Sequence, residues 1–205
     1  MRPTTPGNVI ALDADGVLLD YACAYADAWG DAFGERPQLR DPNAYWPIDR
    51  WAVERLEGAR LAMFRAAFDE EFWSTIPAIP GAVEACQRLI DAGYRLVCVS
   101  AMEDAFATAR LHNLDSLGFP ITEVIATRSD LSQGSPKAMA VAKLQAIAFV
   151  DDYLPYHRGI APSVHKALIL REPSGSPNIG EELELINSQH TNLAAFTDWW
   201  LNFRN

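Results

Sequence analysis

The sequence predicts an α/β fold, in which a parallel β-sheet carries helices on both faces and a small helical segment is inserted near the start. Short apolar runs alternate with stretches of helical periodicity, which is the pattern of consecutive β-α-β units. Several of these apolar runs end in acidic, hydroxyl or glycine residues. Between residues 20 and 80 the strand pattern stops, and an aromatic-rich sequence with helical spacing takes its place.

The first predicted strand, Val9 to Leu12, runs directly into Asp13, Ala14, Asp15 and Gly16. Ligands of open α/β sheets lie at the carboxyl ends of the strands, so both aspartates are expected at such an edge. Carboxylates this close repel each other unless a cation or another positive group compensates. The alternative is an ordinary acidic turn, because Asp-Gly is a common turn signal.

Two later strands also end in polar side chains. The predicted strand Arg95 to Ser100 ends in the hydroxyl of Ser100, and the predicted strand over residues 146–150 is followed by Asp151 and Asp152. Parallel strands present their carboxyl ends at one edge of the sheet, which brings these side chains to the same edge as Asp13.

Between these two strands, Lys137 follows Gly-Ser-Pro at the start of a helix predicted over residues 138–145. The order of carboxylate pair, hydroxyl, lysine and acidic pair resembles the haloacid dehalogenase superfamily, whose four motifs are Asp-x-Asp, Ser or Thr, Lys and an acidic pair. The resemblance spans about residues 8–170. Its first motif, with the flanking Gly-Val-Leu-Leu-Asp, is highly specific, whereas the serine and the lysine gain weight from order and spacing.

The resemblance implies a Rossmann-like three-layer parallel-sheet core, made of residues 1–20 and 79–205, and a helical cap of the C1 type over residues 21–78. Within the cap, helices are predicted over residues 21–33 and 51–73, separated by a proline-marked loop. Most cap aromatics are expected to fill the cap's own interior. The further core elements are helices over residues 80–90, 103–117 and 192–203, strands over 121–126 and 165–170, and a loop over 171–180.

For chemistry, the resemblance implies that Asp13 is the nucleophile and forms an aspartyl-phosphate. A carboxylate serves this role when a divalent cation and a lysine neutralise the approaching phosphate. Asp15 is expected to act as general acid toward the leaving oxygen and then as base toward water. Family members that break carbon–halogen bonds usually lack this second aspartate, so its presence favours phosphate chemistry.

The expected cofactor is Mg²⁺, which prefers hard oxygen ligands. Its predicted ligands are the Asp13 side chain, the main-chain carbonyl of Asp15 and an acid of the pair Asp151 and Asp152. In the family the first acid after the strand is the more usual direct ligand, and the choice between the two is left open. Just beyond this pair, Tyr156, His157 and Arg158 are more readily explained as structural or exposed residues than as substrate contacts.

The predicted phosphate-binding positions are Ser100, Ala101 and Lys137. Ser100 would donate a hydrogen bond to a phosphate oxygen, and Lys137 would bring its ammonium to the nucleophile, helped by the helix N-terminus. The family often has Asn after the serine, and Ala101 removes that second contact. Lys143 is a rival lysine, but its mid-helix position predicts a solvated side chain.

Composition excludes several function classes. The net charge of −10 argues against nucleic acid as the main partner. No apolar stretch has the length of a membrane span, and no secretory signal is visible before the first strand. The three cysteines, Cys23, Cys86 and Cys98, have no metal-ligand spacing and suit a reducing compartment. We therefore expect a cytoplasmic protein whose partner is a small phosphorylated metabolite.

The sequence thus predicts a Mg²⁺-dependent phosphatase that hydrolyses a small organic phosphate. One alternative is a phosphosugar mutase of the same superfamily, which the motifs do not separate from a hydrolase. The other is a catalytically silent binding or regulatory module, which the intact Asp13, Asp15, Lys137 and Asp151 disfavour. Neither the substrate, the oligomeric state nor the substrate-contacting cap residues follow from the sequence.

Overall fold

The predicted fold class is confirmed by a computed structural model that describes residues 7–132 and 134–203. Its centre is a six-stranded sheet in the order β3-β2-β1-β4-β5-β6, and every pairing is parallel. The strands are β1 (Val9–Leu12), β2 (Arg95–Ser100), β3 (Val124–Ala126), β4 (Ala148–Asp151), β5 (His165–Ile169) and β6 (Ser188–His190). The predicted core segments also include residues 1–6, 133, 204 and 205, which lie outside the described residues.

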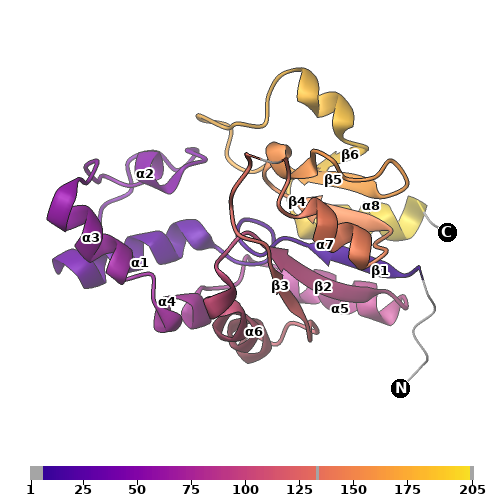
Figure 1. Ribbon diagram of the computed structural model, residues 1–205, viewed down its shortest axis with the longest axis horizontal. Helices are drawn as coiled ribbons and strands as arrows, with labels where there is room; N and C mark the ends of the chain where they lie inside the picture. The colour runs from indigo at the N-terminus through magenta and orange to yellow at the C-terminus, as the bar shows by residue number, and fades with distance from the viewer. Residues whose placement is uncertain (1–6, 133, 204–205) are drawn as a thin grey trace.

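Helices cover both faces of this sheet (Figure 1). Successive strand residues point to opposite faces, and β1 divides accordingly. Ile10 and Leu12 belong to a large apolar cluster, whereas Val9 and Ala11 belong to a second one. The large cluster includes residues of α5 (Ala82–Asp91) and α8 (Leu193–Phe203), and the second includes residues of α7 (Ala138–Lys143). Burial on both faces explains why the strands read as continuous apolar runs.

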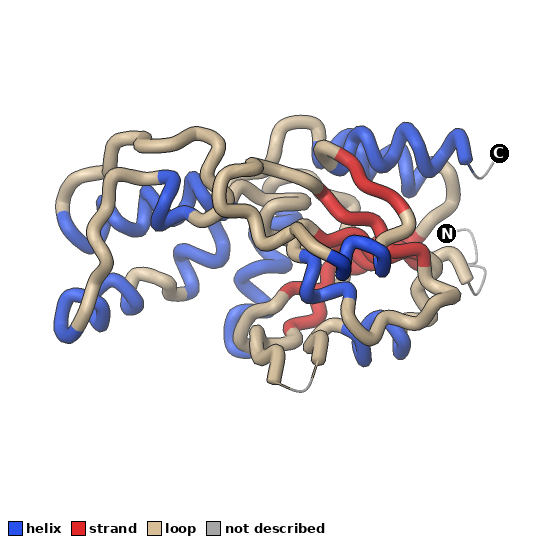
Figure 2. The backbone as a smooth tube through the Cα atoms, turned by 90° about the horizontal axis from the view of Figure 1, so that it is seen from above, coloured by secondary structure: helices blue, strands red, loops and turns tan. Residues whose placement is uncertain are grey.

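Four helices of the segment between β1 and α5 lie to one side of the sheet, at the left of Figure 1, and the view from above in Figure 2 shows the same separation. They are α1 (Tyr21–Phe33), α2 (Pro47–Arg50), α3 (Gly58–Ala66) and α4 (Glu70–Thr75). The Asp20 side chain caps α1 by accepting the Cys23 N–H at 2.9 Å. Gly34 ends this helix with a left-handed φ of 86°.

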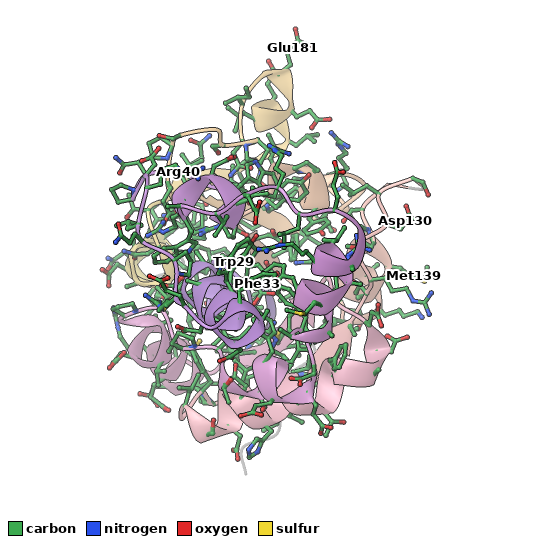
Figure 3. The ribbon with its side chains drawn as sticks, turned by 90° about the vertical axis from the view of Figure 1, so that its left-hand side faces the viewer. Trp29, Phe33, Arg40, Asp130, Met139 and Glu181 are labelled. Atoms are coloured by element: carbon green, nitrogen blue, oxygen red, sulfur yellow. The ribbon has the colours of Figure 1, made fainter. Side chains whose placement is uncertain are left out.

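Aromatic rings fill the space between these helices. Trp29 and Phe33 lie side by side on α1 (Figure 3), with ring centroids 4.7 Å apart. Phe64 of α3 packs on Trp29 at 5.3 Å and on Tyr25 at 5.0 Å, and Phe68 continues the stack 4.9 Å from Phe64. The rings therefore pack mainly on one another, as expected from their helical spacing.

Two connections tie this helical segment to the sheet, and they are hydrogen bonded to each other. The Asp20 N–H donates to the Pro77 carbonyl at 2.8 Å, and the Ile79 N–H donates to the Leu18 carbonyl at 2.9 Å. Leu19 and Ala78 form an antiparallel bridge between them. The chain therefore leaves and re-enters the core through one paired ribbon.

The long helix predicted over residues 51–73 is wrong, because the chain breaks it twice. Residues 51–53 are extended, and the Ala52 N–H donates to the Gln38 carbonyl at 2.8 Å. Asp69 begins a separate helix, since its side chain accepts the Phe72 N–H at 3.0 Å. The helical spacing of the aromatic residues gives no indication of these two hydrogen bonds.

Other boundaries shift by a few residues. The first part of the helix predicted over 103–117 is a 3₁₀ turn, Asp104–Phe106, followed by α6 (Ala107–Ser116). Strand β3 is shorter than predicted and pairs only with the last three residues of β2. Strand β6 was not predicted, because its sequence Ser-Gln-His is polar, as suits the edge of a sheet. No helix among the described residues has both the length and the apolarity to cross a membrane.

Beyond β4, a 3₁₀ turn over Leu154–His157 buries a histidine. His157 is 1% exposed, and its ring lies 5.0 Å from the ring of Phe149. Burial lowers the pKa of His157 to about 3. The imidazole is therefore neutral in the folded protein throughout the range in which an unfolded histidine becomes protonated.

We expect His157 to make folding less stable in acid. Its folded pKa lies below its unfolded value of about 6.5, so stability is fully present above pH 6.5 and is lost as the pH falls toward 3, by at most about 1.4 kcal/mol per pH unit. His157→Phe, which keeps an aromatic ring, should show a shallower loss between pH 6.5 and 5. Urea unfolding of both proteins at several pH values measures this difference, and parallel curves would contradict it.

Candidate active site

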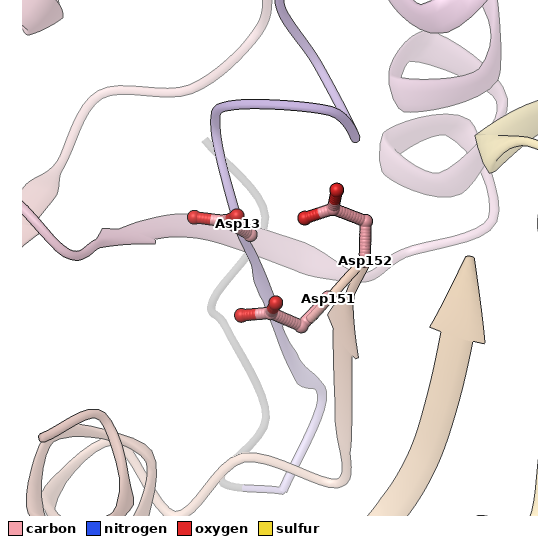
Figure 4. A group of neighbouring side chains, drawn as sticks. All are labelled: Asp13, Asp151 and Asp152. Carbon is pink, nitrogen blue, oxygen red and sulfur yellow. The ribbon is translucent and has the colours of Figure 1, made fainter. Parts of the chain in front are cut away.

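Three aspartates meet where the strand order reverses. Strands β1 and β4 are neighbours at the centre of the sheet, and Asp13 follows one while Asp151 and Asp152 lie at the end of the other. Their carboxylates converge (Figure 4), with one ligand oxygen from each lying within 4.8 Å of the others. All three are buried, at 5%, 0% and 3% exposure. Ligands of doubly wound sheets bind at such a switch point.

Lys137 lies beneath this cluster and pairs with two of its members. Its Nζ is 2.6 Å from Oδ1 of Asp13 and 2.6 Å from Oδ2 of Asp151. The lysine is fully buried, and its ammonium lies 4.6 Å from the centre of the Tyr156 ring. It stands at the N-cap of α7, one residue before that helix begins. The structure thus brings together four of the predicted site residues from three separate parts of the chain.

The electrostatics of the cluster indicate too little positive charge for its carboxylates. Burial raises the pKa of Asp13 to about 7, against the opposing effect of Lys137, and Asp151 and Asp15 raise it further. Burial also raises the pKa of Asp151 to about 6, with Lys137 opposing and Asp152 adding to the rise. Burial alone would lower the pKa of Lys137, but both carboxylates outweigh it and raise that pKa. A further cation would relieve this repulsion.

The oxygens of the acidic pair are not equally available. Oδ2 of Asp151 accepts from Lys137 at 2.6 Å, and its Oδ1 accepts from the Tyr153 N–H at 2.8 Å. Oδ2 of Asp152 accepts from Arg171 Nε at 2.7 Å. No donor from the described part of the chain reaches Oδ1 of Asp152 or Oδ2 of Asp13. These two oxygens, on hard carboxylate ligands, fit a divalent cation.

Asp15 is held by an arginine that the sequence did not reveal. Arg110 of α6 is fully buried, and its Nη2 lies 2.9 Å from Oδ1 and 3.0 Å from Oδ2 of Asp15. Its guanidinium stacks over the Trp73 ring at 5.0 Å. An arginine in the middle of a helix carries no local signal of such a role, so only the folded arrangement identifies it.

Ser100 is the last residue of β2 and is 1% exposed. Within the described residues its Oγ has no hydrogen-bond partner, which is costly for a buried hydroxyl and leaves it available as a donor to a ligand. Ala101, the next residue, lines the cavity described below. Lys143 is exposed, in agreement with the solvated role predicted for it.

A cavity of about 350 Å³ opens above the aspartates. Asp13, Asp15, Ala101 and Asp152 form part of its wall, whereas Ser100, Lys137 and Asp151 are not among its lining residues. Much of the remaining wall is aromatic. Six rings line it, four from the helical segment and two from the chain after β4: Tyr21, Tyr45, Trp46, Trp73, Tyr153 and Tyr156.

Among the residues that the structure describes, the cation in this wall is Arg171, which follows β5 of the sheet. It directly follows β5 and Leu170, so the strand-end rule that identified Asp13 would also have identified it. The helical segment carries six arginines, and none of them lines the cavity: Arg36, Arg40, Arg50, Arg55, Arg60 and Arg65. Five of these are exposed, and Arg50 is half-buried.

Asn178, which sequence reasoning also missed, fixes the main chain of the acidic pair. Its Nδ2 donates to the Asp152 carbonyl at 2.7 Å, and its Oδ1 accepts the Leu154 N–H at 2.8 Å. It lies in the Pro/Gly/Ser loop that follows Arg171, where one asparagine among several turn residues carries no distinguishing pattern. His157 does not line the cavity, which agrees with the structural role expected for it.

Comparison with known proteins places these observations in a family. A model of haloacid dehalogenase-like hydrolases matches residues 8–152. A curated relative from Bordetella pertussis, named "Putative 5'(3')-deoxyribonucleotidase", is 33% identical over 103 residues, which is 46% of this chain and 50% of the relative. The match thus spans about half the length of that relative.

Solved structures share the fold at low sequence identity. A HAD family hydrolase from Deinococcus radiodurans, with bound phosphate and sodium, is 19% identical with a TM-score of 0.57, and 93% of each chain is covered. A predicted phosphoglycolate phosphatase from Haemophilus somnus is 14% identical with a TM-score of 0.62, covering 98% of this chain and 99% of that one. Haloacid dehalogenases of known structure share the fold as well. Because the family model matches residues 8–152, which is most of the chain, this protein belongs to the haloacid dehalogenase-like hydrolases.

Proposed function

We propose that this hydrolase is a Mg²⁺-dependent phosphatase that cleaves a small organic phosphate through an aspartyl-phosphate on Asp13. The observation that carries the proposal is the buried cluster in which Lys137 pairs with Asp13 and Asp151 while Asp15 stands at the cavity wall. We assign residues 21–78 to a cap and residues 1–20 and 79–205 to the catalytic core. The cavity lies between residues of these two parts.

The metal ligands we propose are the Asp13 side chain, the Asp15 main-chain carbonyl and the Asp152 side chain. Asp152 is preferred over Asp151 as the direct ligand because both oxygens of Asp151 already accept hydrogen bonds, from Lys137 and from the Tyr153 N–H. Asp151 then has the separate task of holding Lys137. When bound, Mg²⁺ supplies charge that offsets the repulsion between the carboxylate and the phosphate.

The chain's own residues account for each proton and bond. Asp13 attacks phosphorus, the Asp13 oxygen–phosphorus bond forms, and the bond to the leaving oxygen breaks. Asp15, protonated in this step, gives its proton to that oxygen. The Asp15 carboxylate so formed takes a proton from the water that attacks phosphorus, and the Asp13 oxygen–phosphorus bond breaks to release phosphate. Lys137 offsets negative charge, and the unpaired Ser100 hydroxyl donates to a phosphate oxygen. Arg110 holds the Asp15 side chain by its ion pair.

Asp15 also favours phosphate esters over carbon–halogen bonds. Haloacid dehalogenases share the fold. The resemblance described above implies that family members with that activity usually lack a second aspartate at this position. Here the carboxylate is present, lines the cavity and is held by a buried arginine. A leaving alkoxide requires a proton, which a general acid such as Asp15 would provide, whereas a leaving halide requires none.

The aromatic wall favours a planar leaving group. Tyr21 and Trp73 form one stacked pair, with centroids 6.3 Å apart, and Trp46 and Tyr153 form an edge-to-face pair at 6.1 Å. Rings in the wall of a cavity of about 350 Å³ suit a nucleobase or aryl group. The name of the Bordetella relative agrees with this chemistry. We therefore propose nucleoside monophosphates as the substrate class.

Asp13→Asn should lower kcat by about 10³-fold or more while leaving the fold intact, because the change is nearly isosteric and removes the nucleophile. The measurement is hydrolysis of p-nitrophenyl phosphate, with circular dichroism as the test of folding. Asp31→Asn, an exposed aspartate of α1, is the matched control and should keep wild-type activity. A folded Asp13→Asn protein with more than a few per cent of that activity would disprove the assignment.

Chelation should abolish activity, and added Mg²⁺ should restore it. Ca²⁺ should restore it poorly, because its larger and looser coordination shell positions the carboxylate less well. Asp152→Asn should raise the Mg²⁺ concentration needed for half-maximal rate. Titration of the rate with metal measures these effects, and full activity after exhaustive chelation would rule out the metal assignment.

Trp46→Ala should lower kcat/KM for a nucleoside monophosphate more than for glycerol phosphate, by about 10-fold, since stacking on a ring is worth about 1–3 kcal/mol per base. Trp46 is 40% exposed, so its removal should cost little stability. Leu39→Ala, in the same loop and 51% exposed, is the control. An unchanged ratio of the two specificity constants would show that the ring does not contact the leaving group.

A further inference from the structure

One oxygen of Asp152 is fully occupied while the other is left open. Its Oδ2 accepts from Nε and Nη2 of Arg171, both at 2.7 Å, and from the Tyr45 hydroxyl at 3.2 Å. The same hydroxyl lies 3.3 Å from the Asp152 carbonyl oxygen. Within the described residues, nothing donates to Oδ1. Arg171 and Tyr45 therefore fix the carboxylate by one oxygen and leave the other for a ligand.

Arg171 and Tyr45 also contact each other and extend the contact into the cap. The guanidinium of Arg171 stacks over the Tyr45 ring at 4.9 Å. Its Nη1 lies 3.2 Å from Glu172, which accepts from Arg50 at 2.8 Å. Alternating charges thus run from Asp152 to α2 of the cap.

Gly16, in the first motif, makes room for this arrangement. A Cβ at this position would overlap Oδ2 of Asp152 and Nε of Arg171, and the φ of Gly16 is +87°. Both facts require glycine here. The turn that follows the nucleophile is therefore shaped around the pair of Asp152 and Arg171.

The loop that carries Tyr45 is docked on the core by main-chain hydrogen bonds. We call residues 34–46, between α1 and α2, the cap loop. The Tyr45 N–H donates to the Ser174 carbonyl at 2.9 Å, and the Ser174 N–H donates to the Asn43 carbonyl at 2.9 Å. Ala44 and Ser174 form a parallel bridge. Tyr45 therefore reaches Asp152 only while the cap loop lies on the core.

We infer that Tyr45 and Arg171 are positioning residues for Asp152, and that they link divalent-cation binding at Asp152 to docking of the cap loop. The inference rests on the metal site proposed above. Linkage is reciprocal: a cation that needs a fixed Asp152 must stabilise the docked loop by the same factor by which the docked loop strengthens cation binding. Docking of the cap loop would then depend on whether the metal site is occupied, although the loop does not contact the metal.

Tyr45→Phe is the sharpest test, because it removes one hydroxyl and changes no charge. Removal of Arg171 alone is harder to interpret. Loss of its positive charge would strengthen cation binding, whereas loss of its hydrogen bonds to Asp152 would weaken it. The reporter of loop docking is the Ser174 amide, which is present in every variant and donates across the interface.

We expect Tyr45→Phe to weaken Mg²⁺ binding by about 3- to 10-fold, the effect of losing one hydrogen bond of ordinary strength. Isothermal titration calorimetry on the full chain without substrate measures it. In the wild type, Mg²⁺ should slow hydrogen exchange of the Ser174 amide, and this slowing should shrink in Tyr45→Phe. Arg171→Lys, which keeps the charge but loses the stacked fork, should weaken binding in the same direction.

Tyr25→Phe is the matched control, because Tyr25 packs on Phe64 within the cap and does not line the cavity. It should leave both readouts at wild-type values. Thermal unfolding establishes that each variant is folded, and Arg171→Lys serves as the second variant if Tyr45→Phe is not. Unchanged Mg²⁺ affinity in the folded variants, or wild-type Ser174 exchange that ignores Mg²⁺, overturns the inference while leaving the phosphatase proposal intact. A wild-type chain that binds no Mg²⁺ overturns both.

Discussion

The buried contact of Lys137 with Asp13 and Asp151 is the interaction on which the site depends. It joins Lys137, the residue before α7, to the ends of β1 and β4. It also places a positive charge at the sheet edge where the aspartates gather. Removing one partner would leave an unpaired charge in a dry interior, which is far more costly than the pair itself. The geometry of β1, β4 and α7 is therefore held by the same contact that prepares the nucleophile.

The two parts of the chain contribute different chemistry to the cavity. The sheet edge supplies its charged groups, which are Asp13, Asp15, Asp152 and Arg171. The segment over residues 21–78 supplies rings and no cation, because its arginines lie elsewhere. The charged groups thus all come from the core, whereas four of the six rings come from the inserted segment. The two sets meet at Tyr45, which contacts both Asp152 and Arg171.

The strand ends were predictable because the parallel sheet imposes a simple rule. Apolar runs buried on both faces locate β1, β2 and β4, and each run ends at the edge where ligands bind. Asp13, Ser100 and the acidic pair followed from this rule, and Lys137 from its place in the order. The choice between Asp151 and Asp152 did not, because neighbouring acids differ only in which donors the fold brings to each oxygen.

The remaining site residues were hidden because their roles depend on contacts between distant parts of the chain. Arg110 meets Asp15 only after α6 packs beside the cavity, and Tyr45 meets Asp152 across 107 positions. The broken helix after Trp51 was missed for a related reason. Its aromatic spacing indicates burial, whereas the backbone is decided by the hydrogen bond from the Ala52 N–H to the Gln38 carbonyl and by that from the Phe72 N–H to the Asp69 side chain.

The paired ribbon at Asp20 and Pro77 has a consequence for how such a protein diversifies. The inserted segment begins and ends at two points already joined by hydrogen bonds. A short turn could therefore replace it at a small entropic cost of loop closure. Any segment inserted here therefore begins and ends at the same two anchor points, near the nucleophile Asp13. The segment between these anchor points can therefore change in length and composition while the nucleophile keeps its place, provided that the contact of Tyr45 with Asp152 is kept or replaced.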